Sequence, residues 1–510
     1  MSRSRKPNIF LIMADQWSPS VLGAGGNPAA KTPNIDALAE PGVIFDNFYC
    51  NSPLCGPSRG SMMTGRYASE VGCYDNGAEL PASIPTFVHH LRRADYRTIL
   101  AGKMHFAGPD QLHGFEERLT TDIYPASFLW TPDWDESPVH NPGTSVRQLR
   151  DSGVVKWNMQ LDYDEEVHHQ TLQALRDVAR DESGRPFFLC ASYTHPHDPF
   201  TTLRRYWDLY EGVEIPLPDI ADDSLEGLHP YNQWLQIHHE VDLYPPTEEQ
   251  VYRTRRAYYA MVSYFDEKVG ELVRALHDLD LSDHTIVIVT SDHGEMLGEH
   301  GMWFKRVFYE DSVRVPMIVR GPAEWGRGRR IAEVASLIDL YPTLVDLGRV
   351  PEPEAAKSLS SGDSLLRLLE GGGESWKGEA IAEYCGEGVC NAARMLRTGR
   401  YKYVCVEQHE PQLFDLAADP GETDNVSGKS ELRQVEEHLQ ARVLEGWDGP
   451  TVEAQVRESQ RQRRVILEAL SKGEQTSWDY QPMVNAADQF VRRGHVTAKA
   501  KELRLPNSEE

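Results

Sequence analysis

Short apolar runs that alternate with helical stretches constrain the fold of this chain more than any other feature. The apolar runs lie at residues 8–13, 96–101, 187–193, 285–290 and 315–319. Stretches with helical spacing of apolar residues separate them, at 84–94, 164–180 and 248–279. This alternation predicts an α/β sandwich, in which helices flank a large, mostly parallel or mixed sheet.

Polar side chains follow four of these runs closely. They are Asp15, Lys103, His195 and Asp292. The carboxyl ends of parallel strands meet at one edge of a sheet, and ligands bind in the crevice beyond that edge. We therefore expect these four residues to converge on a single site.

The chain is too long, at 510 residues, for one compact core. Residues 351–376 are rich in Pro, Gly, Ser and Glu, which indicates a connection. We expect a catalytic domain at 1–374 and a smaller α+β domain with a small sheet at 375–475. A tail at 476–510 follows.

The net charge of −26 disfavours nucleic acid and anionic membranes as partners. No stretch approaches the roughly 18 apolar residues of a membrane span. The seven cysteines lack the spacing of a disulfide framework, so we expect a cytoplasmic protein. An anionic substrate would require local cations and a metal in so acidic a chain, whereas a cationic group would be attracted to it.

A cysteine motif carries the strongest chemical signal. Residues 55–59 read CGPSR, and residues 61–66 are expected to form a short helix whose N-terminus favours an anion. Alone, the motif would equally describe a turn with a buried cysteine. Asp15-Gln16 upstream and Asp292-His293 downstream, each at a strand end, weigh against that interpretation.

Together these motifs resemble the sulfatase family of the alkaline phosphatase superfamily, from about residue 7 to residue 424. The resemblance implies that a formylglycine-generating or other sulfatase-maturating enzyme oxidises Cys55 to formylglycine, which hydrates to a diol. One hydroxyl attacks the sulfur of a sulfate monoester and displaces the alcohol. The other then loses its proton, and the collapse to the aldehyde expels sulfate.

The resemblance also implies a metal site. Asp15, Gln16, Asp292, His293 and the modified residue 55 would hold one divalent cation. Calcium is the usual sulfatase ion, and manganese and magnesium stay open. Many sulfatases have a second aspartate where Gln16 stands, so this site has one negative charge fewer.

Three residues are expected to act on the sulfate and the nucleophile. By resemblance, Arg59 holds the nucleophile and its metal environment in place. Lys103 contacts a sulfate oxygen, and His105 supports the diol. These two side chains lie on one edge of an extended segment, because alternate residues point the same way.

Two further residues are expected near the leaving group. We assign His195 to the position beside the leaving oxygen, and Lys305 to its stabilisation or protonation. His197 is interpreted as a turn histidine bonded to Asp198.

The substrate is suggested by a narrower resemblance. Residues 75–76, 102–118, 120–125 and 478–482 are similar to the choline sulfatases within this family. A quaternary ammonium group binds an aromatic face near a carboxylate. Trp130 would supply the face and Glu387 the charge, with His140 as a further candidate, although Trp130 is equally suited to a core. Resemblance of the tail suggests a homo-oligomer, a dimer or tetramer.

Three other functions stay open. One is a broad-specificity arylsulfatase. Another is a phosphonate or phosphate monoester hydrolase, where the Asp-Gln pair and the C-x-P-x-R motif also occur. The third is an inactive binding protein of the same fold, against which the intact set of site residues argues.

Overall fold

A computed structural model describes residues 6–218, 227–473, 478 and 503–504 of the chain. Its largest sheet has eight strands. In spatial order these are β13 (Arg329–Ile331), β2 (Val43–Phe45), β12 (Met317–Arg320), β9 (Thr285–Ser291), β1 (Asn8–Ala14), β7 (Phe187–Ser192), β4 (Arg97–Gly102) and β5 (Glu117–Arg118). The five strands from β9 to β5 are parallel, and β12 runs antiparallel to β9. The expected mixed sheet is confirmed.

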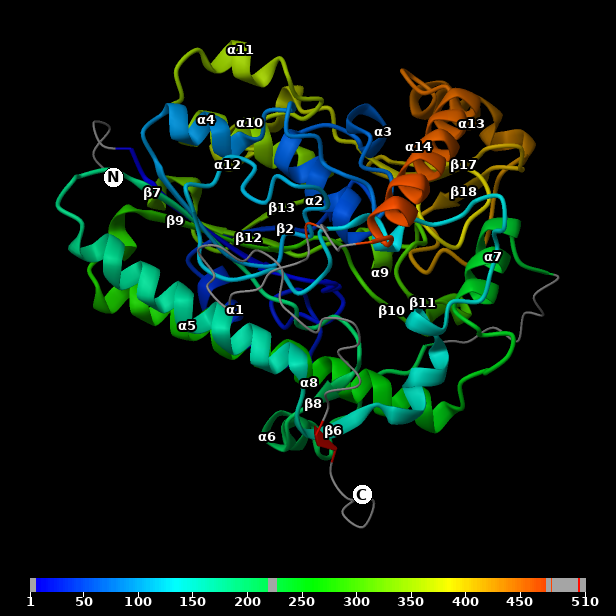
Figure 1. Ribbon diagram of the computed structural model, residues 1–510, viewed down its shortest axis with the longest axis horizontal. Helices are drawn as coiled ribbons and strands as arrows, with labels where there is room; N and C mark the ends of the chain where they lie inside the picture. Colours follow the sequence, from blue (N-terminus) through cyan, green and yellow to red (C-terminus); the bar gives the residue numbers. More distant parts are fainter. Residues whose placement is uncertain (1–5, 219–226, 474–477, 479–502, 505–510) are drawn as a thin grey trace.

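Helices cover both faces of this sheet (Figure 1). Helices α5 (Met159–Arg180) and α8 (Glu248–Asp278) lie on one face. Helices α2 (Cys55–Thr64), α4 (Phe87–Arg93) and α10 (Leu340–Leu347) lie on the other. Alternate residues of β1 enter two separate cores, since Leu11 packs in one and Ile12 in the other. Both faces of the central strands are therefore buried, as parallel sheets require.

Local signals define the long helices. Thr247 caps α8, because its hydroxyl accepts from the backbone N–H of Gln250. The Gln250 side chain in turn accepts from the backbone N–H of Thr247. Glu248 and Glu249 in the first turn favour the positive end of the helix dipole. Asn158 caps α5, because its side chain accepts from the backbone N–H of Leu161.

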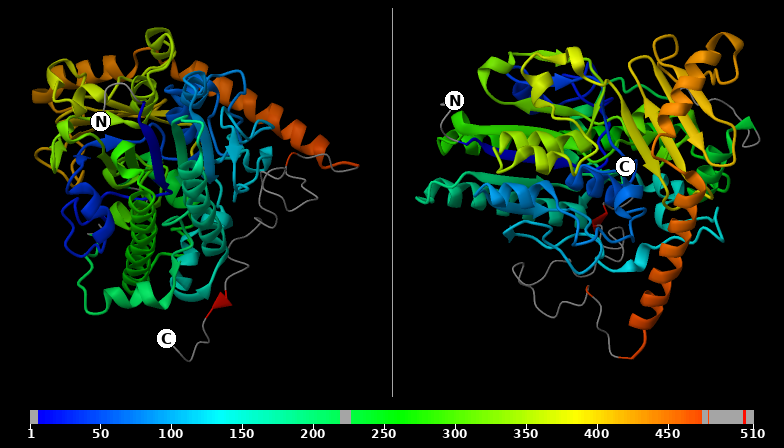
Figure 2. Two further views of the ribbon diagram at one scale, coloured as in Figure 1. Left: turned by 90° about the vertical axis from the view of Figure 1, so that its left-hand side faces the viewer. Right: turned by 90° about the horizontal axis from the view of Figure 1, so that it is seen from above.

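A smaller antiparallel sheet follows. It consists of β15 (Ala380–Tyr384), β16 (Ala393–Arg397), β17 (Tyr401–Val406) and β18 (Gln412–Asp415). Helix α13 (Arg433–Val443) packs on it, and α14 (Gly449–Leu470) passes the main sheet unit and extends outward (Figure 2). The sequence did not predict β16, and the domain boundaries stay predictions.

The expected connection and tail are only partly described. Residues 351–376 contain two short helices, α11 (Pro353–Lys357) and α12 (Leu366–Leu369). Most of the tail, and with it the expected subunit contact, lies outside the described residues. Within it, the Trp478 ring packs on Phe128, and Leu503–Arg504 (β19) pairs with β6 (Gly153–Trp157). No helix in the described ranges has the length and apolarity to cross a membrane.

A buried ion pair joins α14 to the main unit. The Arg463 guanidinium donates to both carboxylate oxygens of Asp75, each at 2.7 Å. The two side chains are 6% and 0% exposed. This bidentate contact lies beside Asn76, which lines the cavity described below.

We predict that Arg463→Ala destabilises the protein by about 3–5 kcal/mol, because it leaves the Asp75 carboxylate buried without its partner. The urea midpoint of unfolding measures this. Arg464→Ala is the matched control, since Arg464 pairs with Asp133 at a more exposed position and should cost less than about 1 kcal/mol. Equal midpoints for both variants would contradict the prediction.

Candidate active site

The central parallel strands place three of the expected residues together. Asp15 follows β1, Lys103 follows β4 and Asp292 follows β9. The Lys103 ammonium bonds to the Asp15 carboxylate, and both side chains are fully buried. Gly102, at φ 110°, lets the end of β4 lie close to β7, because a side chain there would collide with the carbonyl oxygen of Ser192.

Cys55 is the first residue of helix α2. The helix therefore begins six residues before the expected position at residue 61, and its partial positive charge acts on residue 55 itself. The Cys55 Sγ atom lies 3.2 Å from Nε2 of His293 and 3.8 Å from Oδ1 of Asp15. Burial raises the pKa of the Cys55 thiol to about 11, so the unmodified side chain is protonated at neutral pH.

Four buried side chains form a cluster that fits a metal ion. Ligand atoms of Asp15, Cys55, Asp292 and His293 all lie within 4.8 Å of one another. Burial lowers the pKa of His293 to about 3, which leaves a neutral imidazole, and its Nδ1 pairs with the Gly294 carbonyl so that Nε2 faces the cluster. The two carboxylates suit a hard divalent cation such as calcium, magnesium or manganese, whereas the imidazole is a softer ligand.

Arg59 ties this cluster together from a fully buried position. Its guanidinium donates to Asp292 at 2.9 Å and to Asp15 at 3.4 Å. It also donates to the Lys103 carbonyl at 2.7 Å and to the Ser192 hydroxyl at 2.8 Å. Burial raises the pKa of Asp292, but the attraction of the Arg59 guanidinium and of Lys103 outweighs it and lowers that pKa, so Asp292 is a carboxylate.

The His105 ring packs against two aromatic side chains. Its ring centroid is 5.1 Å from that of Tyr124 and 5.4 Å from that of Trp130. Both ring nitrogens are buried and have no hydrogen-bond partner among the described residues. Burial lowers the pKa of His105 to about 3. Its support of residue 55 stays a prediction.

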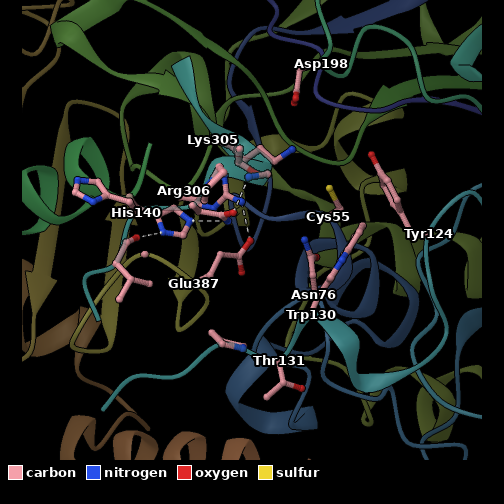
Figure 3. A pocket seen from close by; sticks show the side chains of 18 of the residues that line it. Cys55, Asn76, Tyr124, Trp130, Thr131, His140, Asp198, Lys305, Arg306 and Glu387 are labelled. Carbon is pink, nitrogen blue, oxygen red and sulfur yellow. Dashed lines mark hydrogen bonds and ion pairs between the residues drawn. The ribbon is translucent and has the colours of Figure 1, made fainter. Parts of the chain in front are cut away.

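A cavity of about 570 Å³ connects the cysteine to the expected substrate residues (Figure 3). Cys55 and Lys305 line it together with Trp130, Glu387 and His140. Glu387 follows strand β15 and accepts from the Arg306 guanidinium at 2.7 Å. His140 is half-exposed and pairs with Asp242 at 3.1 Å.

The structure places the His195 side chain away from the cavity. Its Nδ1 lies 2.6 Å from Asp164 on α5, its ring packs against Tyr264, and it does not line the cavity. The Asp164 carboxylate also accepts from the backbone N–H of His195, which holds the ring at the α5–α8 face. The His195 carbonyl instead accepts from the backbone N–H of Asp15.

His197 takes the cavity position instead. Its Nε2 accepts from the Lys305 ammonium at 2.7 Å, while its Nδ1 lies 2.7 Å from the Asp198 carbonyl, as a turn histidine would. Burial and the charges of Lys305 and Lys103 lower the pKa of His197 well below its usual value. The repeated histidine at residues 195 and 197 is the sequence signal that marks the alternative.

Other cavity residues had weaker signals or none. Arg306 adjoins Lys305, and adjacent residues of a strand point to opposite faces. Here Phe304 and Arg306 have φ of 67° and 85°, and this left-handed backbone lets both Lys305 and Arg306 line the cavity. Tyr124, Asn76 and Asp198 line it as well.

Comparison with known proteins identifies the family. The sulfatase family model matches residues 7–350. This chain belongs to the sulfatase family. Models of an N-sulphoglucosamine sulphohydrolase C-terminal region and of a choline sulfatase C-terminal region match residues 298–447 and 454–500.

Relatives agree with this assignment. A choline-sulfatase of Rhizobium meliloti is 41% identical over 500 residues, which cover 96% of each chain. An arylsulfatase of Clostridium perfringens is 28% identical, covering 87% of this chain and 95% of its own. The protein is therefore a sulfatase, a hydrolase of sulfate esters, and it resembles choline sulfatase.

Solved structures share the fold. The phosphonate monoester hydrolase of Agrobacterium radiobacter superposes with a TM-score of 0.69 at 24% identity, covering 88% of this chain and 96% of its own. The corresponding hydrolase of Silicibacter pomeroyi gives 0.70 at 23% identity, covering 86% and 95%. The alkaline phosphatase-like architecture expected for the sulfatase is confirmed.

We predict that calcium stabilises chelator-stripped sulfatase by about 2.7 kcal/mol when its concentration is a hundredfold above Kd, because only the folded chain assembles the four-residue cluster. Thermal unfolding with and without calcium, manganese or magnesium measures the shift. Asp292→Asn, which weakens the cluster, should lose most of it. Unfolding temperatures that no ion changes would refute the metal site.

Proposed function

We propose that this sulfatase hydrolyses choline sulfate, with a formylglycine made from Cys55 as nucleophile and one divalent cation, calcium foremost, at residues 15, 16, 55, 292 and 293. The observation that carries the proposal is a single cavity that joins Cys55 to Trp130 and Glu387. Similarity to a choline-sulfatase over 96% of the chain supports it. The proposal includes a sulfatase-maturating enzyme as partner and a homo-oligomer, either a dimer or a tetramer.

The Cys55 end of the cavity suits a sulfate group. A formylglycine diol at residue 55 would supply the attacking hydroxyl, and a cation held by Asp15, Asp292 and His293 would supply positive charge that favours its deprotonated form. Arg59 fixes the two carboxylates that flank residue 55. Lys305, which lines the cavity, and Lys103, which bonds to the buried Asp15 carboxylate, would supply positive charge near the sulfate. The N-terminus of α2 adds to that field.

The leaving oxygen is best served by Lys305 and His197. Lys305 lines the cavity and donates to Nε2 of His197, so the two side chains form one proton-transfer unit. A choline alkoxide is a poor leaving group, and protonation by such a unit contributes typically 10²–10⁴-fold to rate. We therefore transfer the role first given to His195 to His197.

The far end of the cavity suits a quaternary ammonium ion. That group donates no conventional hydrogen bond, so it binds aromatic faces and negative charge. Trp130 and Tyr124, with centroids 4.8 Å apart, supply the faces. Burial raises the pKa of Glu387, but Arg306 outweighs it and keeps the group ionised. Arg306 binds one Glu387 oxygen, and the other has no hydrogen-bond partner in the part of the chain that the structure describes.

The charge on choline provides a direct test of this end. We predict that the wild-type sulfatase cleaves choline sulfate with a much higher kcat/KM than 3,3-dimethylbutyl sulfate, its uncharged isostere. Trp130→Ala should lower kcat/KM for choline sulfate roughly 2- to 30-fold, the range of a cation–π contact. Glu387→Gln should also reduce the preference for choline sulfate over the uncharged isostere. Initial rates are compared on protein whose aldehyde content is known by mass.

The neutral isostere is the control, because it has the same shape and its turnover should change little in either variant. Equal losses of kcat/KM for both esters would show that Trp130 and Glu387 have structural roles and do not recognise the cation. Comparable or better turnover of 4-nitrophenyl sulfate or of a phosphonate monoester by the wild type would contradict choline specificity.

The histidine reassignment gives a separate prediction. His197→Ala should lower kcat for choline sulfate by about 10²–10⁴-fold, and much less for 4-nitrophenyl sulfate, whose leaving group needs no proton. His195→Ala should instead lower stability by about 1–3 kcal/mol, because Asp164 loses a buried donor. Steady-state kinetics and urea unfolding on both variants measure this, and a leaving-group effect in His195→Ala alone would reverse the assignment.

A broad-specificity arylsulfatase that also cleaves phosphonate monoesters is the second candidate. The observation that favours it is the cavity volume of about 570 Å³, which lies in the range that accepts drug-sized ligands. An aryl ester would fit against Tyr124 and Trp130. The uncharged-isostere comparison separates the two candidates.

A further inference from the structure

Every polar group of Gln16 is bound in a buried setting. Its backbone N–H donates to Oδ1 of Asp292 at 3.0 Å, and its carbonyl accepts from the Tyr258 hydroxyl at 2.7 Å. Its φ of 66° is left-handed, so these bonds hold an otherwise unfavourable backbone. The residue is fully buried.

The side-chain amide has one permitted orientation. Its Oε1 accepts from the Lys305 ammonium, and its Nε2 donates to Oε2 of Glu295. A lysine ammonium only donates, so the amide oxygen must face Lys305. A flipped amide would set two donors against each other at Lys305, whereas in the observed orientation the amide N–H reaches a Glu295 oxygen that accepts it. The bonds at the two ends therefore agree on one orientation.

Glu295 is itself fixed in place. It is 1% exposed, and its backbone N–H donates to the Asp311 carbonyl at 2.8 Å. Gly294 allows that approach, because a Cβ there would lie 2.0 Å from the same carbonyl oxygen. The other carboxylate oxygen of Glu295 has no hydrogen-bond partner among the described residues. The contact with Gln16 is therefore its main polar function.

We propose that Glu295 is a positioning residue that fixes the Gln16 amide with its oxygen toward Lys305, and that makes position 16 specific for an amide. This inference rests on the proposed metal site, where Gln16 would be a neutral oxygen ligand. A carboxyl group at position 16 would face the Glu295 carboxyl in a buried contact. Neither oxygen of that carboxyl group has an N–H to donate to Glu295, so the contact that orients the side chain at position 16 would be lost.

Calcium binding by chelator-stripped protein tests the proposal, with calorimetry as the readout and no substrate present. Glu295→Leu should weaken calcium binding roughly 10- to 100-fold, the usual effect of losing a residue that orients a metal ligand. Glu295→Gln should stay within about threefold of the wild type, because its amide oxygen still accepts from Gln16. Thermal unfolding in chelator reports the stability of each variant independently.

A residue exchange keeps the test valid if Glu295→Leu fails to fold. Gln16→Glu alone should bind calcium poorly and unfold earlier in chelator. Adding Glu295→Gln to Gln16→Glu should restore both properties, because the amide and the carboxylate have only changed places. A non-additive double-mutant cycle is the expected signature of direct contact.

Glu453→Leu is the matched control. Glu453 is also a buried carboxylate that accepts from an amide, at 2.9 Å from Nδ2 of Asn391, but it lies on α14. Its loss should lower the unfolding temperature and leave calcium affinity unchanged. This separates general destabilisation from loss of ligand orientation.

The outcomes distinguish this inference from the proposed function. Unchanged calcium affinity in Glu295→Leu, or no rescue in the exchange, would overturn the role of Glu295 and leave the metal site intact. Failure of the wild type to bind calcium, manganese or magnesium would overturn the metal site and this inference together. A failure of choline specificity would leave the result untouched, because no substrate is used.

Discussion

The active site depends on one buried guanidinium. Arg59 contacts residues at the ends of four adjacent strands, namely Asp292 after β9, Asp15 after β1, Ser192 on β7 and the Lys103 carbonyl after β4. Two carboxylates in so small a volume would repel each other or take up protons without it. Removal of one partner from a buried network leaves the other charges without compensation. The arrangement of the whole sheet edge therefore depends on Arg59.

The two ends of the cavity have different electrostatic tasks. A chain with net charge −26 repels an anion at long range, and the site compensates with lysines, a helix N-terminus and, near Cys55, a cluster that could hold a metal ion. The far end contains the negative charge of Glu387, which Arg306 only partly neutralises because it binds one of the two carboxylate oxygens. A zwitterionic ester would therefore bind in one direction, with its sulfate at the nucleophile.

Periodicity and strand ends were sufficient to predict the sheet and the convergence of Asp15, Lys103 and Asp292. These positions follow from strand direction alone. The direction of a side chain in a turn depends on contacts that no local pattern encodes. His195 turns away because Asp164, on a distant helix, binds it, and Arg306 reaches the cavity through a left-handed backbone. Strand β16 was missed because it shows neither an apolar run nor clear alternation.

Chemistry and specificity reside in different parts of this structure. The sheet edge positions Cys55 and the cluster of Asp15, Asp292 and His293, and phosphonate monoester hydrolases share its fold. The proposed cation-binding end combines Trp130, the last residue of a 3-10 helix, with Glu387, which follows β15 of the smaller sheet. The Arg463–Asp75 pair fixes α14 beside that end. A change in the packing of the smaller unit would therefore alter substrate choice and leave the cluster around Arg59 undisturbed.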